Sequence, residues 1–499
     1  TGLELFAGLP ALEELLSGRL MLEMPDVERP LTIAHDNIRE VIYSEASLTK
    51  RRLYHRQLFF ILEQEKVPSA ELAFHAKAAN LHQESFAYAV LAGDQSLAVY
   101  AFSDAFVFYE QALAEADRVA MSVDQQCQLC VRYGRSLELS GRYQDALDHY
   151  IAMQQSARKS GSQQLELTAL VAQGTIYATA NELSNFELGG QVGKQALALA
   201  QALGDQAAEA RLQWNMLNVY RMTNRDEQAL QAGKRAIALG EALGLQEVTA
   251  YATNDIVYTY MALGDVAQVL AVGEKAIALW RALGNQPMLT DSLINYANTQ
   301  AMSGEFDLAL EIAAEALAIS QSLNNRWAES FSLYTYSMVY WRTMVVAKAL
   351  AAMTQSVALG EQTGFTGAQV LVRVFQVQML LAMGDGAEAA KVAETAVSVA
   401  KDSIPLFLPA AQGAAALVSL HHNDLSQAES IISGNGFHSL APNLMNFFTP
   451  ETAVCLYLLA TEKYDTAFAT SRRVSAYLHA QNLRMYLPEF LYLQGAALA

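Results

Sequence analysis

Apolar residues recur at helical spacing along most of the chain, and short polar turns interrupt them at regular intervals. Between Asn224 and Gly384 every step from one turn to the next is 40 residues long. The turns begin at or near Gly141, Asn181, Asn224, Gly264, Gly304, Met344, Gly384, Asn423 and Glu462. A fixed period of this size is typical of stacked supersecondary units. The pattern therefore predicts an array of helix pairs, with one turn inside each pair.

The two helices of each pair carry different residues. The helix before a turn, helix A, ends in an aromatic anchor, at Tyr177, Tyr220, Tyr260 and Tyr340. The helix after it, helix B, carries alanines where the two helices must approach closely, at Ala196, Ala236, Ala276 and Ala316. Glycines suited to left-handed helix ends link the pairs, at Gly204, Gly244 and Gly284. We expect an all-α fold, a right-handed superhelical solenoid of antiparallel helix pairs.

Two stretches depart from the period. The step from Asn181 to Asn224 is 43 residues, which places three extra residues around Leu183 to Leu188. The stretch from Ile431 to Pro450 is rich in glycine and proline, and we interpret it as a loosened unit or a longer loop.

The first residues of the chain follow a different pattern. Residues 12–16 form a short amphipathic helix, and residues 19–23 and 31–34 have the character of two strands around a polar turn at 25–30. Asp36 is placed to cap a following helix. Helix, hairpin and helix together outline the end of a small winged-helix module.

This contrast divides the chain into two expected domains. Residues 1–60 would be the C-terminal part of the winged-helix domain. Residues 61–499 would be the repeat array, with about ten units and the last one truncated. Because the chain starts at Thr1 and stops within a helical pattern, we expect it to be a piece of a longer protein.

The composition narrows the range of partners. Of 499 residues 52% are hydrophobic, and the formal net charge is −18. An acidic surface disfavours binding to nucleic acid or to an anionic membrane. No apolar run is long enough to span a bilayer, and no signal peptide is recognisable. Three cysteines cannot form a disulfide framework, so a cytoplasmic location is expected.

No catalytic or metal-binding constellation is recognisable. Cys127 and Cys130 lie three residues apart in a helical stretch without a second ligand pair, and core packing is the favoured interpretation over metal or redox chemistry. The phosphate-binding motif Gly-x-x-x-x-Gly-Lys-Ser/Thr is absent. We expect this segment to be no enzyme and to hold no cofactor of its own.

The repeat pattern resembles tetratricopeptide repeats (TPRs), in their long variety of about 40 residues found in bacterial signalling ATPases. Leu217 to Tyr220 before a turn, and Ala229 and Leu230 after it, carry the resemblance. It extends over roughly residues 70–499 and implies a protein-interaction array.

The N-terminal segment resembles the winged-helix tail of STAND-type signal-transducing ATPases, which include transcription activators similar to the maltose regulator. Residues 33–43 and 51–55 carry this resemblance. It implies that His35 senses the phosphate of bound ADP, with Asp36 as the helix cap beside it. The ATP or ADP would belong to an NTPase domain outside this sequence.

The 40-residue step predicts which side chains line the concave wall, where helices A lie. The four columns are Trp214, Asn254, Ile294 and Tyr334; Asn218, Tyr258, Asn298 and Met338; Arg211, Tyr251, Asp291 and Phe331; and Arg221, Met261, Ala301 and Trp341. Their aromatic, amide and charged members are the candidate ligand-binding residues. The alternative is that the aromatics fill space between helices and the amides face water.

These features favour a ligand-sensing, protein-interaction arm of a STAND-type ATPase. The groove would bind a protein, a peptide or a small inducer and bias the nucleotide-dependent switch, and the parent protein could assemble into a ligand-dependent homo-oligomer. The alternative is a passive scaffold that only assembles partner proteins.

Overall fold

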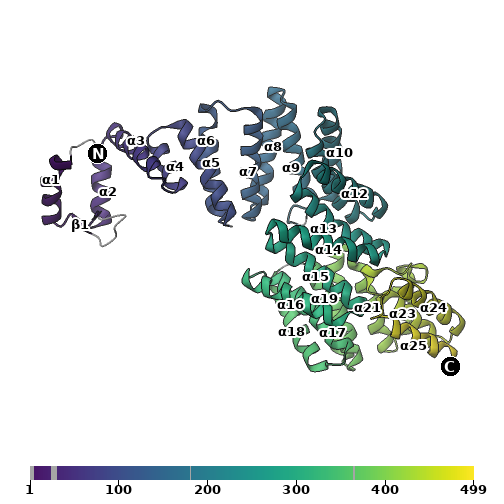
Figure 1. Cartoon of the computed structure of the whole chain (residues 1–499). Helices are drawn as coiled ribbons and strands as arrows, with labels where there is room; N and C mark the ends of the chain where they lie inside the picture. Colours follow the sequence, from purple (N-terminus) through teal and green to yellow (C-terminus); the bar gives the residue numbers. More distant parts are fainter. Residues whose placement is uncertain (1–4, 24–30, 100, 180, 364–365) are drawn as a thin grey trace. The chain divides into compact units, whose positions relative to one another are not determined.

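The computed structural model describes the whole chain except residues 1–4, 24–30, 100, 180 and 364–365 (Figure 1). The chain divides into two compact units, which are described separately. Unit 1 comprises Thr1–Ile176 and Ala180–Ser184, and unit 2 comprises Tyr177–Thr179 and Asn185–Ala499. The described residues are overwhelmingly helical, which confirms the all-α repeat solenoid expected from the 40-residue period.

Unit 1 begins with the expected helix and hairpin. Its first elements are α1 (Leu5–Ser17), β1 (Met21–Glu23), β2 (Leu31–Ile33) and α2 (Asp36–Glu45). The strands pair antiparallel with Met21 opposite Ile33, which confirms the predicted hairpin. Its connecting turn, predicted at residues 25–30, lies outside the described residues.

The predicted cap at Asp36 is wrong by one residue. His35 is the N-cap, with extended backbone at φ −143°, and no side chain caps this helix end. Asp36 is the first residue inside α2, where its carboxylate lies 3.1 Å from the Arg39 guanidinium. A negative charge in the first turn still interacts favourably with the helix dipole.

Helix pairs make up the rest of unit 1. They are α3 (Leu48–Gln64), α4 (Ser69–Ala78), α5 (His82–Ala98), α6 (Phe102–Glu115), α7 (Val123–Leu139), α8 (Tyr143–Ser160) and α9 (Gln163–Ala178), with a short 3-10 turn η1 (Ala116–Arg118). A tyrosine of helix B packs against a glycine of helix A. A Cβ at Gly134 would lie 2.2 Å from Cζ of Tyr150, which is 1% exposed, so only glycine fits there.

Unit 2 continues with the most regular repeats. Its helices are α10 (Phe186–Leu203), α11 (Gln206–Met222), α12 (Asp226–Leu243), α13 (Gln246–Leu263), α14 (Val266–Leu283), α15 (Gln286–Met302), α16 (Phe306–Ser322), α17 (Arg326–Arg342), α18 (Val346–Thr363), α19 (Thr366–Ala382) and α20 (Gly386–Ser403). The four alanines predicted at close helix contacts are fully buried, at Ala196, Ala236, Ala276 and Ala316.

The periodic turns owe their residue types to backbone conformation. The turn residue adopts the left-handed region in each regular unit, for example at φ 55° in Asn224, 73° in Gly264 and 81° in Gly304. Glycine and asparagine tolerate this region best. Met344 and Glu462 adopt the same conformation at φ 61° and 57°, so two turns keep the geometry without a favourable residue.

The irregular stretches lie where the sequence placed them. α9 ends at Ala178 and α10 begins only at Phe186, which accommodates the three extra residues. The C-terminal part of unit 2 contains η2 (Pro405–Phe407), α21 (Leu408–His421), α22 (Leu425–Gly434), η3 (Phe437–Ser439), η4 (Leu444–Asn446), α23 (Thr449–Ala460), α24 (Tyr464–Ala480) and α25 (Leu487–Leu498). Two short 3-10 turns thus replace the second half of a helix B.

Candidate functional site

One carboxylate, Asp255 in the middle of α13, joins two successive A helices. Its Oδ2 accepts hydrogen bonds from Nε1 of Trp214 at 2.7 Å and from Nδ2 of Asn218 at 2.9 Å. Trp214 and Asn218 lie four residues apart on α11 and therefore share one helix face. The Oδ1 of Asp255 accepts a bond from Nδ2 of Asn254 at 3.2 Å. Asp255 thus connects three of the predicted binding residues.

Equivalent bonds connect the following A helices. Nδ2 of Asn254 donates to Oδ2 of Asp291 at 3.0 Å, and Nδ2 of Asn295 donates to the Tyr258 hydroxyl at 2.8 Å. Each of these pairs, like Asn218 with Asp255, is 37 residues apart in sequence. This spacing is shorter than the 40-residue repeat by about one helical turn. The same hydrogen-bond geometry therefore recurs from one repeat to the next.

We call the polar side chains that connect successive A helices the polar layer. It consists of Trp214, Asn218, Arg221, Asn254, Asp255, Tyr258, Asp291, Asn295, Asn298 and Thr335, the last two joined by a 2.7 Å bond from Thr335 Oγ1 to Asn298 Oδ1. The predicted binding amides Asn218, Asn254 and Asn298 are 3%, 4% and 8% exposed. They therefore hydrogen-bond inside the array and do not face water.

Other members of the polar layer keep part of their surface exposed. They are Arg221, Asp255, Tyr258, Asp291 and Asn295, all half-buried. A half-buried side chain can still reach a ligand, whereas a fully buried one can act only through its neighbours. These five residues are therefore the part of the polar layer that a ligand could contact.

A guanidinium, a carboxyl and a phenol meet in the polar layer. The Arg221 guanidinium stacks 4.8 Å from the centre of the Tyr258 ring and donates to Asn218 Oδ1 at 3.0 Å. Burial raises the pKa of the Asp291 carboxyl to about 6, although the hydrogen bond from Asn254 opposes the shift. Burial also raises the pKa of the Tyr258 phenol, so Tyr258 remains a neutral hydrogen-bonding group near pH 7.

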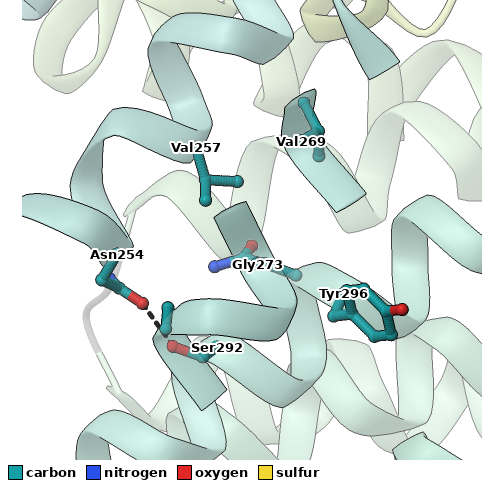
Figure 2. A pocket seen from close by; sticks show the side chains of 8 residues that line it. Asn254, Val257, Val269, Gly273, Ser292 and Tyr296 are labelled. Carbon is teal, nitrogen blue, oxygen red and sulfur yellow. Dashed lines mark hydrogen bonds between the residues drawn. The ribbon is translucent and has the colours of Figure 1, made fainter. Parts of the chain in front are cut away.

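A small pocket lies beside the polar layer, between α13, α14 and α15 (Figure 2). Ser292 Oγ donates to Asn254 Oδ1 at 2.5 Å on one side of it, and Gly273 and Tyr296 lie on the other. Its volume of about 10 Å³ is close to the minimum for one water molecule. It is therefore too small to receive a side chain of a peptide ligand.

Arg211 and Tyr251 lie at one edge of the polar layer. The Tyr251 ring packs between Trp214 and Trp280, with both ring centres 4.9 Å away. The Arg211 guanidinium lies 5.9 Å from the centre of the Trp214 ring. The structure thus brings both residues to the same cluster as Trp214, on the α11 and α13 side.

The predicted binding residues of α17 lie in a different environment. Phe331 and Tyr334 are 9% and 2% exposed, and Trp341 packs half-buried against the same hydrophobic core. Tyr486 and Phe448, which come from the C-terminal part of the chain, belong to that core as well. The aromatic-rich segment of α17 is therefore covered by protein.

Polar contacts also fix the C-terminal segment to earlier repeats of unit 2. The Met485 amide donates to the Met302 carbonyl at 3.1 Å, and Nε of Arg484 donates to the Ser303 carbonyl at 2.8 Å. The Val266 amide donates to Oε1 of Gln481 at 3.3 Å. The loop between α24 and α25 therefore contacts the turns after α13 and α15, and we call this contact the closure.

His35 and the cysteine pair belong to unit 1, whereas the polar layer belongs to unit 2. His35 is exposed at the start of α2. Burial raises the pKa values of the Cys127 and Cys130 thiols, the latter to about 11, which makes both unreactive near pH 7. In the described part of the chain no three histidine, cysteine, aspartate or glutamate side chains are grouped to hold a metal ion.

Sequence reasoning missed Asp255 and Asn295, two central residues of the polar layer. The same 40-residue step that gave the predicted columns places Asn215, Asp255, Asn295 and Thr335 in one column. All four are polar in the middle of helices A, where apolar residues usually pack. That uniform polarity was the signal for a structural hydrogen-bonding column.

Comparison with known families identifies the repeat type in part of unit 2. Residues 248–322 match the family model described as tetratricopeptide repeat. This stretch contains α13 without its first two residues, α14 to α16, and most of the polar layer. No curated protein sequence matches the chain significantly. In the described helices, none combines the length and the apolar character needed to cross a bilayer.

Several solved structures are similar at low sequence identity. A Rap protein complexed with competence and sporulation factor is 14% identical, with 82% of this chain and 99% of that chain covered and a TM-score of 0.48. A STAND protein with a tetratricopeptide repeat sensor from Pyrococcus horikoshii is 13% identical, with 85% and 57% covered and a TM-score of 0.42. Aspartyl phosphate phosphatase F from Bacillus subtilis is 11% identical, with 83% and 94% covered and a TM-score of 0.38.

Proposed function

We propose that this chain is a protein-interaction and ligand-sensing repeat array, which binds a peptide or protein at the half-buried part of the polar layer. The observation that carries this proposal is the grouping of Arg221, Asp255, Tyr258, Asp291 and Asn295 on successive A helices. A peptide backbone offers N–H donors and C=O acceptors, and this set offers acceptors and donors side by side. Tyr251, half-buried at the edge and packed on the buried Trp214, supplies aromatic surface of the kind that anchors ligands.

The covered aromatic residues of α17 have a different role in this proposal. Because Phe331 and Tyr334 are buried and Trp341 packs against the same hydrophobic core, these residues stabilise the array and do not touch the ligand. The binding surface is thereby confined to α11, α13 and α15.

In the finer proposal, the array belongs to a STAND-type ATPase. Residues 1–60 would be the winged-helix tail, with His35 near the nucleotide phosphate, and residues 61–499 the sensor. Ligand binding would bias the nucleotide-dependent switch only if the ligand binds the two states with different affinity. Proteolysis of the chain with and without ligand tests this coupling, since unchanged cleavage within residues 1–60 would contradict it.

A passive scaffold is the second candidate, and the closure favours it. The closure joins residues as much as 215 positions apart and holds the helices of unit 2 in one arrangement. A rigid array can hold partners without changing shape. The scaffold would bind partners at the polar layer and leave the ATPase rate of the parent protein unchanged.

Binding is tested by native mass spectrometry of species retained from a host lysate. The variant Arg221→Gln/Tyr258→Phe changes two half-buried residues of the polar layer without removing bulk. The matched control is Arg281→Gln, since Arg281 pairs with Glu315 on the B helices. We expect the double variant to lose a ligand that the control retains, and hydrogen exchange of the complex to show protection in α11, α13 and α15. Equal retention by both proteins would contradict the proposed site.

A further inference from the structure

A chain of three side chains connects the N-terminal segment of unit 1 to its first repeat helix. Tyr43 lies on α2, His55 on α3 and His75 on α4. The Tyr43 hydroxyl lies 2.9 Å from Nε2 of His55, and Nδ1 of His55 lies 2.9 Å from Nδ1 of His75. Three consecutive helices are thus joined through one imidazole that uses both of its nitrogens.

The central imidazole is shielded from water. His55 is 6% exposed, and its ring packs edge-on against Phe74 at 5.5 Å and Tyr43 at 5.8 Å. The Arg51 guanidinium lies 5.0 Å from the centre of the Tyr43 ring. A buried imidazole with two short contacts is held in place by them, and it pays a desolvation cost when it becomes charged.

Charged and titratable groups surround the pair on each neighbouring helix. Tyr43 approaches from α2, Arg51 from α3, and Glu71 from α4, where its charge favours protonation of His75. From α5, Tyr88 donates to Glu63 at 2.9 Å, two helical turns further along α3.

The contact between the two imidazoles depends on their protons. A nitrogen-to-nitrogen hydrogen bond needs one N–H donor and one bare acceptor, so at least one imidazole must be neutral. If both rings are protonated, two N–H groups and two positive charges face each other across 2.9 Å. Burial lowers the pKa of both histidines, and for His55 the charge of His75 lowers it further.

We propose that Tyr43, His55 and His75 form a proton-operated latch between the N-terminal segment and the repeat array. The latch is closed while at least one imidazole is neutral, and it opens when both are protonated. This places a pH-sensitive joint at the junction through which any signal from the repeats must pass to residues 1–60. The latch does not depend on the ligand proposed above.

The direction of the pH effect follows from the lowered pKa values. Between the folded pKa and the ordinary value of 6.5, the open state binds protons that the closed state does not. The latch is therefore fully stable above pH 6.5 and is lost as the pH falls through the lower, folded values. Opening rises by about tenfold per pH unit for each proton taken up.

The latch is tested by hydrogen exchange of the whole chain at pH 7.5 and 5.5, corrected for intrinsic rates. We expect α2, α3 and the first turns of α4 to lose protection at pH 5.5 in the wild type. The variant His75→Asn keeps a hydrogen-bonding group but cannot titrate. In this variant the ratio of corrected exchange rates between pH 5.5 and pH 7.5 is expected to be smaller by at least about tenfold. His82→Asn is the matched control, because His82 pairs with Glu115 at 2.7 Å on neighbouring helices of the same unit.

Two outcomes would overturn the proposal. One is a pH dependence of α2 to α4 that is the same in wild type and His75→Asn. The other is a nitrogen NMR titration in which His55 and His75 become protonated independently and at the ordinary histidine pKa. This second test uses only the wild type, so it does not depend on whether the variant folds. Depressed and mutually dependent titrations of these two rings are the supporting result.

Discussion

At the scale of single residues, Asp255 is the acceptor on which the polar layer depends. Replacing it with alanine leaves Nε1 of Trp214 and Nδ2 of Asn218 without their acceptor inside the array. A buried donor without a partner costs about 1–3 kcal/mol. We expect Asp255→Ala to lower the free energy of unfolding of unit 2 by about 2–5 kcal/mol, measured by urea denaturation followed by tryptophan fluorescence.

The control for this prediction is Glu394→Ala, at an exposed position in the middle of α20. Its effect should stay within about 0.5 kcal/mol, as for most surface substitutions. If Asp255→Ala were equally mild, water would be replacing the carboxylate, and the polar layer would be an accessible surface with little structural role.

A second residue-scale prediction concerns the buried acid Glu451 at the start of α23. Burial raises its pKa to about 7, from an ordinary value of 4.5, although nearby backbone N–H groups and Arg473 oppose the shift. Between these two values the folded chain keeps a proton that the unfolded chain has lost. Its contribution to stability is therefore complete below pH 4.5 and is lost as the pH rises to about 7.

A single proton of this kind changes the free energy of unfolding by about 1.4 kcal/mol per pH unit across that interval. Glu451→Gln is expected to remove this pH dependence. Urea denaturation at a series of pH values from 4.5 to 8 measures it. The exposed Glu394→Gln should keep the wild-type slope. Parallel curves for wild type and Glu451→Gln would mean that Glu451 titrates at its ordinary pKa.

At the scale of elements, one periodic turn can be improved. Met344 holds φ 61° at a position where its side chain is 79% exposed, so it bears backbone strain without contributing to the core. Left-handed conformation costs a non-glycine residue about 1 kcal/mol. We expect Met344→Gly to raise the free energy of unfolding of unit 2 by about 0.5–1 kcal/mol, less than the full strain because glycine also loosens the unfolded chain.

The contrasting variant is Asn224→Gly, in the equivalent turn at φ 55°. Asparagine already tolerates this conformation, so the change should be close to neutral. Thermal denaturation of the two variants compares them directly, and a destabilising Met344→Gly would show that methionine makes compensating contacts.

The elements themselves could be predicted from sequence because their causes are local. Turn residues such as Gly264 and Asn224 need left-handed backbone, and alanines such as Ala236 allow close helix contact, so both recur with the period. The cap at α2 was misplaced by one residue because neither His35 nor Asp36 makes a side-chain capping bond there. Without that bond, the residue type alone does not mark the first turn of the helix.

At the scale of the whole molecule, the closure could not be predicted from the period. It joins Arg484 to Ser303 and Gln481 to Val266, residues 181 and 215 positions apart. Nothing in a nearest-neighbour repeat indicates which distant unit will be met. Because the period does not show which distant segments pack together, Tyr334 and Phe331 were predicted to line the groove. In the structure both are buried in the core of unit 2.

The closure makes a testable difference to how unit 2 unfolds. In an open array each repeat contacts only its neighbours, so a destabilising substitution at one end has little effect on distant repeats. Tyr486 is 4% exposed, belongs to the same core as Tyr334, and lies under the Arg342 guanidinium at 5.6 Å. Tyr486→Ala should therefore destabilise by about 3–5 kcal/mol and lower hydrogen-exchange protection in α15 and α17 as well as in α24 and α25.

Tyr464→Ala, at a tyrosine of α24 that is 48% exposed, separates this effect from a general weakening of the C-terminal helices. It should leave protection in α15 and α17 unchanged. If Tyr486→Ala also left these two helices unchanged, the C-terminal segment would be an independent unit resting on the array. Loss of protection on both sides of the closure would instead mean that unit 2 folds as one body, in which a ligand at the polar layer would be sensed by helices more than one repeat away.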